Sequence, residues 1–354
     1  MTTVAKPQTQ PPQPPAAKVN RLGLPVAAYQ GAESTLCSGC GHDSVTLQLI
    51  KAFHELDIQP YNVAKLSGIG CSSKTTAYFM NRSHGFNAVH GRMAAIATGV
   101  AMANRKLVSV GVSGDGDTAS IGLGHFLHMV RRNVPIVYII ENNGVYGLTK
   151  GQFSATADKG SVSKGGGKNE MMPIDCCALA IQMGCDYVAR SFSGDFKQLT
   201  ALIKGAVAHK GCAVIDVISP CITFNNHPGS TKSYKYAKEH EEPIHEVDFI
   251  PQYDEIKVDY DPGTTTKVDL PDGSYLLIKK LEREYNPGNR GGALDLLHKA
   301  SEEKLFLTGL IYHGSNHVPL PDQMGLIDTP LSQLPSSATR PSNEVLTKIM
   351  QELM

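Results

Sequence analysis

The sequence predicts a doubly wound, mostly parallel α/β sheet followed by a C-terminal extension. Short apolar runs typical of buried strands alternate with helix-like runs, and glycine-rich or polar residues come directly after the strand-like runs. This alternation is typical of a parallel sheet that is covered by helices on both faces and binds ligands at the carboxyl ends of its strands. The strand-like runs lie near Asn62, Leu107, Pro135, Asp186 and Ala213, and the helix-like runs begin near Gly41, His90, Ser120, Ile174 and Phe196.

The composition divides the chain into three segments. Residues 1–27 are expected to form a disordered tail, because Met1 to Ala17 is rich in Pro, Gln and Ala and lacks the apolar core of a signal peptide. Residues 28–230 contain the predicted sheet, and the irregular stretch 150–173 within them is expected to be a loop that moves or orders on binding. Residues 231–354 form the extension, which we expect to pack on the core or on a partner subunit.

The extension carries two local signals of its own. Residues 268–278 are typical of a β-hairpin, because two short strand patterns flank Asp272-Gly273. The chain then ends in an amphipathic pattern from Ser342 to Leu353, which predicts a helix.

Charge and composition exclude several classes of partner. The chain has 354 residues, 33 basic against 33 acidic side chains, and 41% hydrophobic residues, so neither nucleic acid nor a membrane is expected as a partner. No apolar run approaches the length of a bilayer span, and the expected location is the cytoplasm. In that compartment the eight cysteines favour reduced thiols and metal ligands over disulfides.

Four of the cysteines lie in turns. Cys37 and Cys40 share a glycine-rich turn that runs into a helix-like segment, so both sulfurs can face one point, and the helix start is expected to lower their pKa. This suits either a thiolate ligand or a redox nucleophile. Cys71 follows the strand near Asn62, and Cys221 follows the strand near Ala213. Four such thiolates fit an iron–sulfur cluster or a structural zinc ion. The others are expected to be plain core thiols: Cys176, Cys177, Cys185 and Cys212.

A second predicted site lies where two neighbouring strands end. The strand near Leu107 ends in Gly114 to Asp117, and the strand from Pro135 delivers Asn142 and Asn143. A carboxylate, an amide oxygen and a backbone carbonyl are the hard ligands that Mg²⁺ prefers, and the glycines let backbone N–H groups reach phosphates. Glu141 is expected to point to the opposite face of its strand from Asn142, and we assign it no role.

These residues carry a resemblance to a known family. The pair Gly114-Asp115-Gly116 and Asn142-Asn143 resembles the thiamine diphosphate motif. The runs around Cys37 to His42, residues 68–73, residues 90–92, residues 146–152 and Ser219 to Cys221 resemble the beta subunit of the 2-oxoacid:ferredoxin oxidoreductases. The resemblance extends from about Ala32 to the C-terminus.

The resemblance implies a thiamine diphosphate-binding fold of the pyrophosphate-binding type and a specific set of site residues. One [4Fe-4S] cluster would be bound by Cys37, Cys40, Cys71 and Cys221. Mg²⁺ would be held by Asp115, Asn143 and the backbone oxygen of Val145. The thiamine diphosphate would be lined by Ile69, Gly70, Cys71, Ser72, His90, Gly91, Arg92, Gly116, Asp117, Gly147 and Leu148.

The chemistry implied by the resemblance is coenzyme A-dependent oxidative decarboxylation of a 2-oxoacid, with electrons passing through the cluster to ferredoxin. Enzymes of this type need an activating Glu on a pyrimidine-binding domain, and this chain contains one convincing α/β unit. We therefore expect an alpha subunit to supply the missing half and the catalytic Glu, and this chain alone to be inactive.

Two lysines suggest the substrate. Lys74 follows the Cys71 turn, and Lys150 follows the predicted Mg²⁺ loop. The distal carboxylate of 2-oxoglutarate would pair with such ammonium groups, whereas pyruvate would leave them unpaired. We therefore favour 2-oxoglutarate over pyruvate, the alternative being two solvated surface lysines.

Other classes of protein explain only part of the pattern. A zinc-binding structural protein would use the four thiols but leave Asp115 and Asn143 without purpose. A thioredoxin-like enzyme would use only Cys37 and Cys40, and a cluster-free thiamine lyase would ignore the cysteines.

Overall fold

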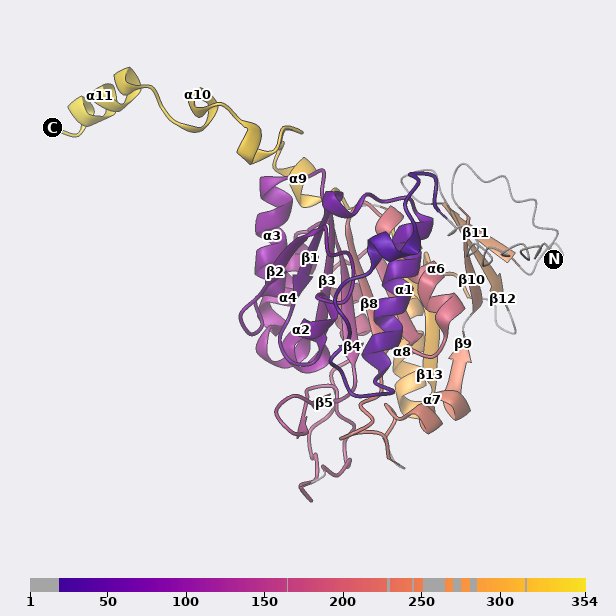
Figure 1. Cartoon of the computed structure of the whole chain (residues 1–354). Helices are drawn as coiled ribbons and strands as arrows, with labels where there is room; N and C mark the ends of the chain where they lie inside the picture. The colour runs from indigo at the N-terminus through magenta and orange to yellow at the C-terminus, as the bar shows by residue number, and fades with distance from the viewer. Residues whose placement is uncertain are drawn as a thin grey trace, which may run out of the picture.

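The computed structural model describes residues 19–163, 165–227, 230–243, 245–250, 265–269, 275–280, 285–315 and 317–354. Their main element is an eight-stranded sheet with the strand order β2-β1-β3-β4-β8-β7-β13-β9 (Figure 1). Its first six strands in this order are parallel, β13 is antiparallel to β7, and β9 is parallel to β13. The strands are β1 Val63–Ser67, β2 His84–Asn87, β3 Val108–Gly114, β4 Ile136–Asn142, β7 Tyr187–Phe192, β8 Cys212–Ile218, β9 Glu241–Pro243 and β13 Phe306–His313.

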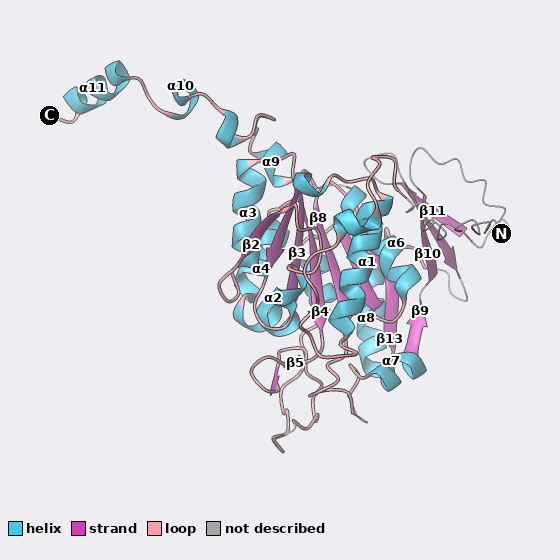
Figure 2. Cartoon of the chain, in the orientation of Figure 1, coloured by secondary structure: helices cyan, strands magenta, loops and turns pink. Residues whose placement is uncertain are grey.

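Helices cover both faces of this sheet, which confirms the predicted fold class (Figure 2). One face packs on α1 Gly41–Glu55 and α6 Phe196–Ala208, and the other packs on α3 Met93–Ala103, α4 Leu123–Arg131, α5 Cys176–Gln182 and α8 Arg290–Glu303. The two cores alternate along each central strand. In β4, Val137 and Ile139 face α1 and α6, whereas Tyr138 and Ile140 face the opposite layer. This is the period of two that a strand buried on both faces requires.

Side-chain caps fix where two of these helices begin. The Asp175 carboxylate accepts hydrogen bonds from the backbone N–H groups of Cys177 and Ala178 at the start of α5, and Asp195 accepts one from Gln198 at the start of α6. Each cap satisfies donors that have no partner within the helix. The four cysteines predicted to be core thiols are all buried, as expected.

The strand register brings the predicted site segments to one edge of the sheet. Gly114 of β3 lies beside Glu141 of β4, and Asn142 lies beside Ile218 of β8. The chain therefore leaves all three strands at the same level, immediately before Asp115 and Asn143 and three residues before Cys221. Two short strands follow in the connecting loop, β5 Val145–Tyr146 and β6 Gln152–Phe153, and the helix α2 Ser72–Thr75 follows β1.

The C-terminal extension contributes to the main sheet. Strands β9 and β13 and helix α8 all come from it, and α7 Tyr234–His240 precedes β9. The predicted hairpin is present as the antiparallel pair β11 Thr265–Asp269 and β12 Tyr275–Lys280, which β10 His245–Ile250 extends; its turn lies outside the described residues. The predicted final helix is present as α11 Asn343–Glu352, beyond α9 Leu320–Gln323 and α10 Ser336–Thr339, in an arm that leads away from the sheet (Figure 1).

The proposed boundary of the N-terminal tail requires a correction. Residues 1–18 lie outside the described residues, but residues 19–27, which we assigned to the tail, bond to the first helix and the turn after it. The Asn20 amide donates to the His54 carbonyl at 3.1 Å, and the Arg21 backbone N–H donates to Asp57 at 2.8 Å. Composition alone does not show such contacts. Within the described ranges, no helix is long and apolar enough to cross a membrane.

Candidate functional site

Asp115 and Asn143 meet at the carboxyl edge of the sheet, as the sequence predicts for neighbouring strand ends. The Asn143 backbone N–H donates to Asp115 Oδ1 at 3.3 Å, and Asn143 Oδ1 accepts from the Val145 backbone N–H at 3.1 Å. Asp115, Asn143 and Val145 are all buried. The three residues thus share one small enclosed region that is lined by oxygen atoms.

The Asp115 carboxylate is held by two hydroxyl groups that the sequence analysis did not identify. Ser154 Oγ donates to Asp115 Oδ2, and Thr156 Oγ1 donates to the same oxygen at 2.5 Å. Burial raises the pKa of Asp115, and these hydrogen bonds oppose the rise. A bound cation would favour the ionised carboxylate further. The donor set of a carboxylate and an amide, both removed from water, therefore fits Mg²⁺.

Three of the predicted cofactor-lining turns contact one another through Asp117. Its carboxylate accepts hydrogen bonds from the Gly91 backbone N–H at 2.7 Å and from Ser113 Oγ at 3.0 Å. A Cβ atom on Gly68 would lie 2.6 Å from Asp117 Oδ2, so only glycine permits this approach. Asp117 thus holds together the turns that contain residues 69–72, 90–92 and 116–117.

The other lining residues are distributed around these turns. Gly70 and Gly91 have φ angles of 89° and 67°, which favour glycine. Ser72 is buried and donates to the Ile69 carbonyl at 3.2 Å. His90, Arg92 and Leu148 are exposed. Helix α3 begins after Arg92 without a side-chain cap.

The four turn cysteines are neighbours, and Gly147 links them to the oxygen-lined region. A Cβ atom on Gly147 would lie 3.6 Å from the sulfurs of both Cys71 and Cys221. The cysteines are close enough for their charges to interact. Cys37 contributes to the raised pKa of Cys71, and Cys221 and Cys71 contribute to the raised pKa of Cys40. Among the described residues, no group of three or more His, Cys, Asp or Glu side chains is arranged to hold a metal ion. The thiols themselves are the donor type that an iron–sulfur cluster takes.

The expectation that the helix start lowers the thiol pKa is wrong for Cys40. Burial raises the pKa of Cys40 to about 12, and the nearby charges of Glu141, Cys221 and Cys71 add to the rise. Burial also raises the pKa of Cys71, although Lys74 opposes it. A buried thiol with a raised pKa is a poor redox nucleophile, which disfavours that role for Cys40 and Cys71.

Behind the thiols lies a buried polar cluster that contains Glu141. Its carboxylate accepts a hydrogen bond from Thr75 Oγ1 at 3.0 Å and lies 3.7 Å from His42 Nε2, while His42 Nδ1 contacts Ser219 Oγ at 2.6 Å. Burial raises the pKa of Glu141 well above its usual value and lowers that of His42 to about 4. Glu141 indeed points away from Asn142, as predicted. A carboxylate directly after the apolar run 136–140 was the available signal for this cluster.

The two predicted substrate lysines differ in exposure. Lys74 is half-buried in α2, close enough to Cys71 for its charge to oppose the rise that burial causes in the pKa of Cys71. Lys150 is exposed, with a φ angle of 80°, and its backbone N–H donates to the Gly147 carbonyl at 3.1 Å.

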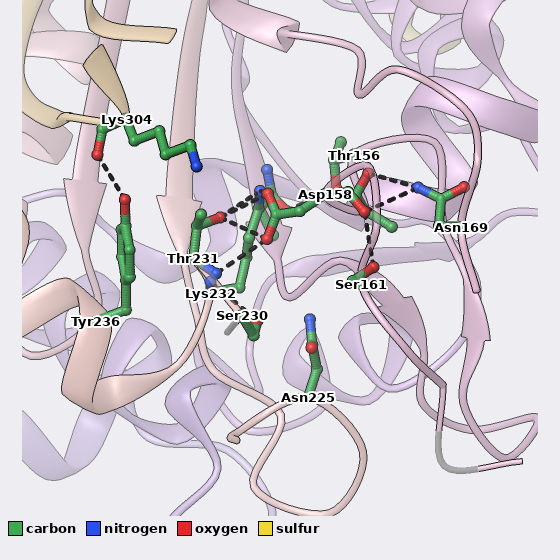
Figure 3. A network of polar contacts seen from close by, with 12 residues as sticks. Thr156, Asp158, Ser161, Asn169, Asn225, Ser230, Thr231, Lys232, Tyr236 and Lys304 are labelled. Carbon is green, nitrogen blue, oxygen red and sulfur yellow. Dashed lines mark hydrogen bonds and ion pairs between the residues drawn. The ribbon is translucent and has the colours of Figure 1, made fainter. Parts of the chain in front are cut away.

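A second polar network ties the loop after β6 to the segment after Cys221. Asp158 accepts hydrogen bonds from Thr231 Oγ1 at 2.7 Å and from Lys232 Nζ at 2.8 Å (Figure 3). Burial would raise the pKa of Asp158, but Lys232 and Thr231 hold it below its usual value. In the same segment, Asn225 Nδ2 donates to the Asn143 carbonyl at 2.7 Å.

Comparisons with known proteins agree with this geometry. Residues 68–217 match the family of the C-terminal TPP-binding domain of thiamine pyrophosphate enzymes. A 2-oxoacid:ferredoxin oxidoreductase beta subunit from a Sulfolobus species is 40% identical over 232 residues, which are 65% of this chain and 74% of that protein. The 2-oxoglutarate oxidoreductase subunit KorB of Mycobacterium tuberculosis is 39% identical over 192 residues, which are 54% of this chain and 51% of that protein.

A solved structure gives the same result for the fold. It is described as 2-oxoglutarate:ferredoxin oxidoreductase from Magnetococcus marinus with 2-oxoglutarate, coenzyme A and succinyl-CoA bound. It aligns with a TM-score of 0.70 and 28% sequence identity, covering 88% of this chain and 95% of that chain. The matched TPP-binding family includes β3, β4 and β8 together with Asp115 and Asn143, so the region is a thiamine diphosphate-binding domain. The chain therefore belongs to the beta subunits of the 2-oxoacid:ferredoxin oxidoreductases.

Proposed function

We propose that this subunit catalyses, together with its alpha subunit, the coenzyme A-dependent oxidative decarboxylation of 2-oxoglutarate to succinyl-CoA and CO₂, or the reverse reaction. Electrons would pass through a [4Fe-4S] cluster to ferredoxin. The observation that carries this proposal is that two donor sets lie at one edge of the sheet. Gly147 separates the sulfurs of Cys71 and Cys221 on one side from the loop of Asn143 on the other.

Each donor set suits one group. Asp115, Asn143 and the Val145 carbonyl would hold Mg²⁺, and the turns joined by Asp117 would lie along the diphosphate. Cys37, Cys40, Cys71 and Cys221 would hold the cluster. When bound, thiamine diphosphate supplies the electron sink for decarboxylation, and the cluster accepts single electrons. The chain's own task is to orient these groups and to exclude water from Asp115.

The metal content of the purified complex tests this proposal. On protein isolated without oxygen together with its alpha subunit, we expect about four irons and about four acid-labile sulfides per beta chain. Zinc in place of iron would support a zinc-binding structural role for the thiols. No metal on the thiols would favour a thiamine enzyme without a cluster.

The choice of 2-oxoglutarate over pyruvate rests on the two lysines and on the relatives named for 2-oxoglutarate. Replacing Lys74 or Lys150 with Met is expected to raise KM for 2-oxoglutarate about tenfold and to leave KM for pyruvate nearly unchanged, since a tenfold change corresponds to about 1.4 kcal/mol of lost pairing. Steady-state kinetics with both substrates measures this. Lys197→Met, at an exposed lysine in α6, is the control. Equal effects on both substrates would favour pyruvate or another 2-oxoacid.

A further inference from the structure

The segment Ser154–Asp158, here called the strap, supplies both side-chain hydrogen bonds that reach Asp115. Ser154 and Thr156 lie in a turn that is closed by a hydrogen bond from the Ala157 backbone N–H to the Ser154 carbonyl at 3.2 Å, and their hydroxyls converge on Asp115 Oδ2. All three residues are buried, with Asp115 1% and Thr156 2% exposed. Water therefore does not replace these donors when they are lost.

The two oxygens of Asp115 are bonded unequally. Oδ2 accepts the two short hydroxyl bonds, whereas Oδ1 accepts the longer 3.3 Å bond from the Asn143 backbone N–H. A carboxylate oxygen has two lone pairs, so Oδ1 retains acceptor capacity on the side of Asn143. The strap thus fixes the rotation of the carboxylate and turns Oδ1 toward Asn143, where a cation would bind.

Thr156 also connects the metal-binding strand end to a neighbouring buried ion pair. Its Oγ1 lies 2.9 Å from Asn142 Oδ1, and Asn142 Nδ2 donates to Asp216 Oδ1 at 3.0 Å. Asp216 in turn pairs with Arg190 at 3.0 Å. A hydroxyl has one proton, so Thr156 cannot donate to Asp115 and Asn142 together, and the shorter contact, to the charged group, is the stronger.

The far end of the strap is anchored from two directions (Figure 3). Asp158 is held by Thr231 and Lys232, and the backbone carbonyls of Ala157 and Asp158 accept hydrogen bonds from Asn169 Nδ2 at 2.9 and 3.1 Å. The segment that holds Asp158 also bonds the Asn143 carbonyl through Asn225. The segment 225–232 therefore holds both the strap, through Asp158, and the backbone of Asn143.

We propose that Thr156, assisted by Ser154, is a positioning residue that holds the Asp115 carboxylate in its cation-binding orientation, and that the contacts of Asp158 with Thr231 and Lys232 keep the strap in place. The proposal rests on the Mg²⁺ and thiamine diphosphate site proposed above. Groups that hydrogen-bond a metal-binding residue typically change metal affinity about 10- to 100-fold when they are removed.

The test measures cation affinity directly, without turnover. The complex with the alpha subunit is stripped of cations and cofactor and titrated with Mn²⁺ in excess thiamine diphosphate, and free Mn²⁺ is followed by electron paramagnetic resonance. Thr156→Val, which keeps shape but removes the hydroxyl, is expected to raise the Kd for Mn²⁺ at least about tenfold. Thr156→Ser restores the donor and is expected to return the Kd to within about threefold of the unmutated complex. Lys232→Met, which loosens the strap from outside, is expected to have a smaller effect in the same direction.

Thr200→Val provides the matched control, because Thr200 is equally buried but bonds to Gln48 between α1 and α6. It is expected to lower Tm without changing the Kd. If Thr156→Val does not fold, Ser154→Ala carries the same test, since it removes the other donor to Asp115 Oδ2.

The outcomes separate this inference from the proposed function. An unchanged Kd in Thr156→Val, or failure of Thr156→Ser to restore a raised one, overturns the positioning role while leaving the cofactor site intact. If the unmutated complex binds no Mn²⁺ in the presence of thiamine diphosphate, the proposed cofactor site is wrong and the positioning role falls with it.

Discussion

Replacing Asp115 with Asn is expected to lower 2-oxoacid-dependent reduction of ferredoxin by the assembled complex about 10³-fold or more. The substitution keeps the size of the side chain but removes the carboxylate charge at the oxygen-lined end of β3. A neutral amide would bind Mg²⁺ weakly there, and the diphosphate would lose its bridging cation. The rate is measured with 2-oxoglutarate, coenzyme A and ferredoxin, and the affinity for thiamine diphosphate by calorimetry.

Iron content and a second buried acid separate this effect from general damage. The Asp115→Asn complex is expected to retain its iron, because no cysteine is changed. Asp186→Asn applies the same substitution to a buried carboxylate that bonds His317 and lies before the start of β7, at the opposite edge of the sheet. It is expected to keep most of the activity. Near-normal activity in Asp115→Asn would show that the cation is held elsewhere.

The sequence predicted the main α/β architecture well, because its strands and helices are long and strongly patterned. Each of the five strand-like runs is present, and Asp115 and Asn143 meet because parallel strands end at a common edge. The addition of β13 to the sheet was not predicted. Its partner β7 lies more than one hundred residues earlier, and the apolar run Phe306–Ile311 contains no signal for the strand with which it pairs.

The supporting residues of the site were harder to predict than the residues that would bind cofactors. Ser154 and Thr156 lie in a loop without periodicity, and their role depends on where that loop crosses Asp115. Asp117 is predicted to line the cofactor, and the structure adds a role that its motif does not indicate: its carboxylate bonds to the turn of Gly91 and to Ser113. The pKa of Cys40 was expected to fall at a helix start but rises because the thiol is buried, and burial is a property of the fold rather than of the motif.

The thiols provide the second large effect. Replacing Cys71 with Ala is expected to abolish measurable electron transfer to ferredoxin and to reduce iron per chain to a small fraction of normal, because a [4Fe-4S] cluster requires a ligand for each iron. Cys71 is half-buried beside Gly147, so removal of its sulfur opens space next to the loop of Asn143 without changing any group that bonds Asp115. Although Cys71 is also among the residues expected to line the thiamine diphosphate, Ala keeps the backbone of its turn, so thiamine diphosphate and Mg²⁺ are expected to bind nearly as before.

Cys176→Ala is the matched control for this variant. Cys176 is the first residue of α5 and is buried in the core, outside the set of thiols proposed to bind the cluster, and its replacement is expected to lower Tm while leaving iron and visible absorption unchanged. If Cys71→Ala retained full iron and sulfide, the assignment of Cys71 would be wrong even if a cluster were present. Together with Asp115→Asn, the two variants should fail in opposite ways: one keeps iron but loses the diphosphate cofactor, and the other keeps the cofactor but loses iron. Such a crossed result would show that the two donor sets bind separate groups at one edge of the sheet.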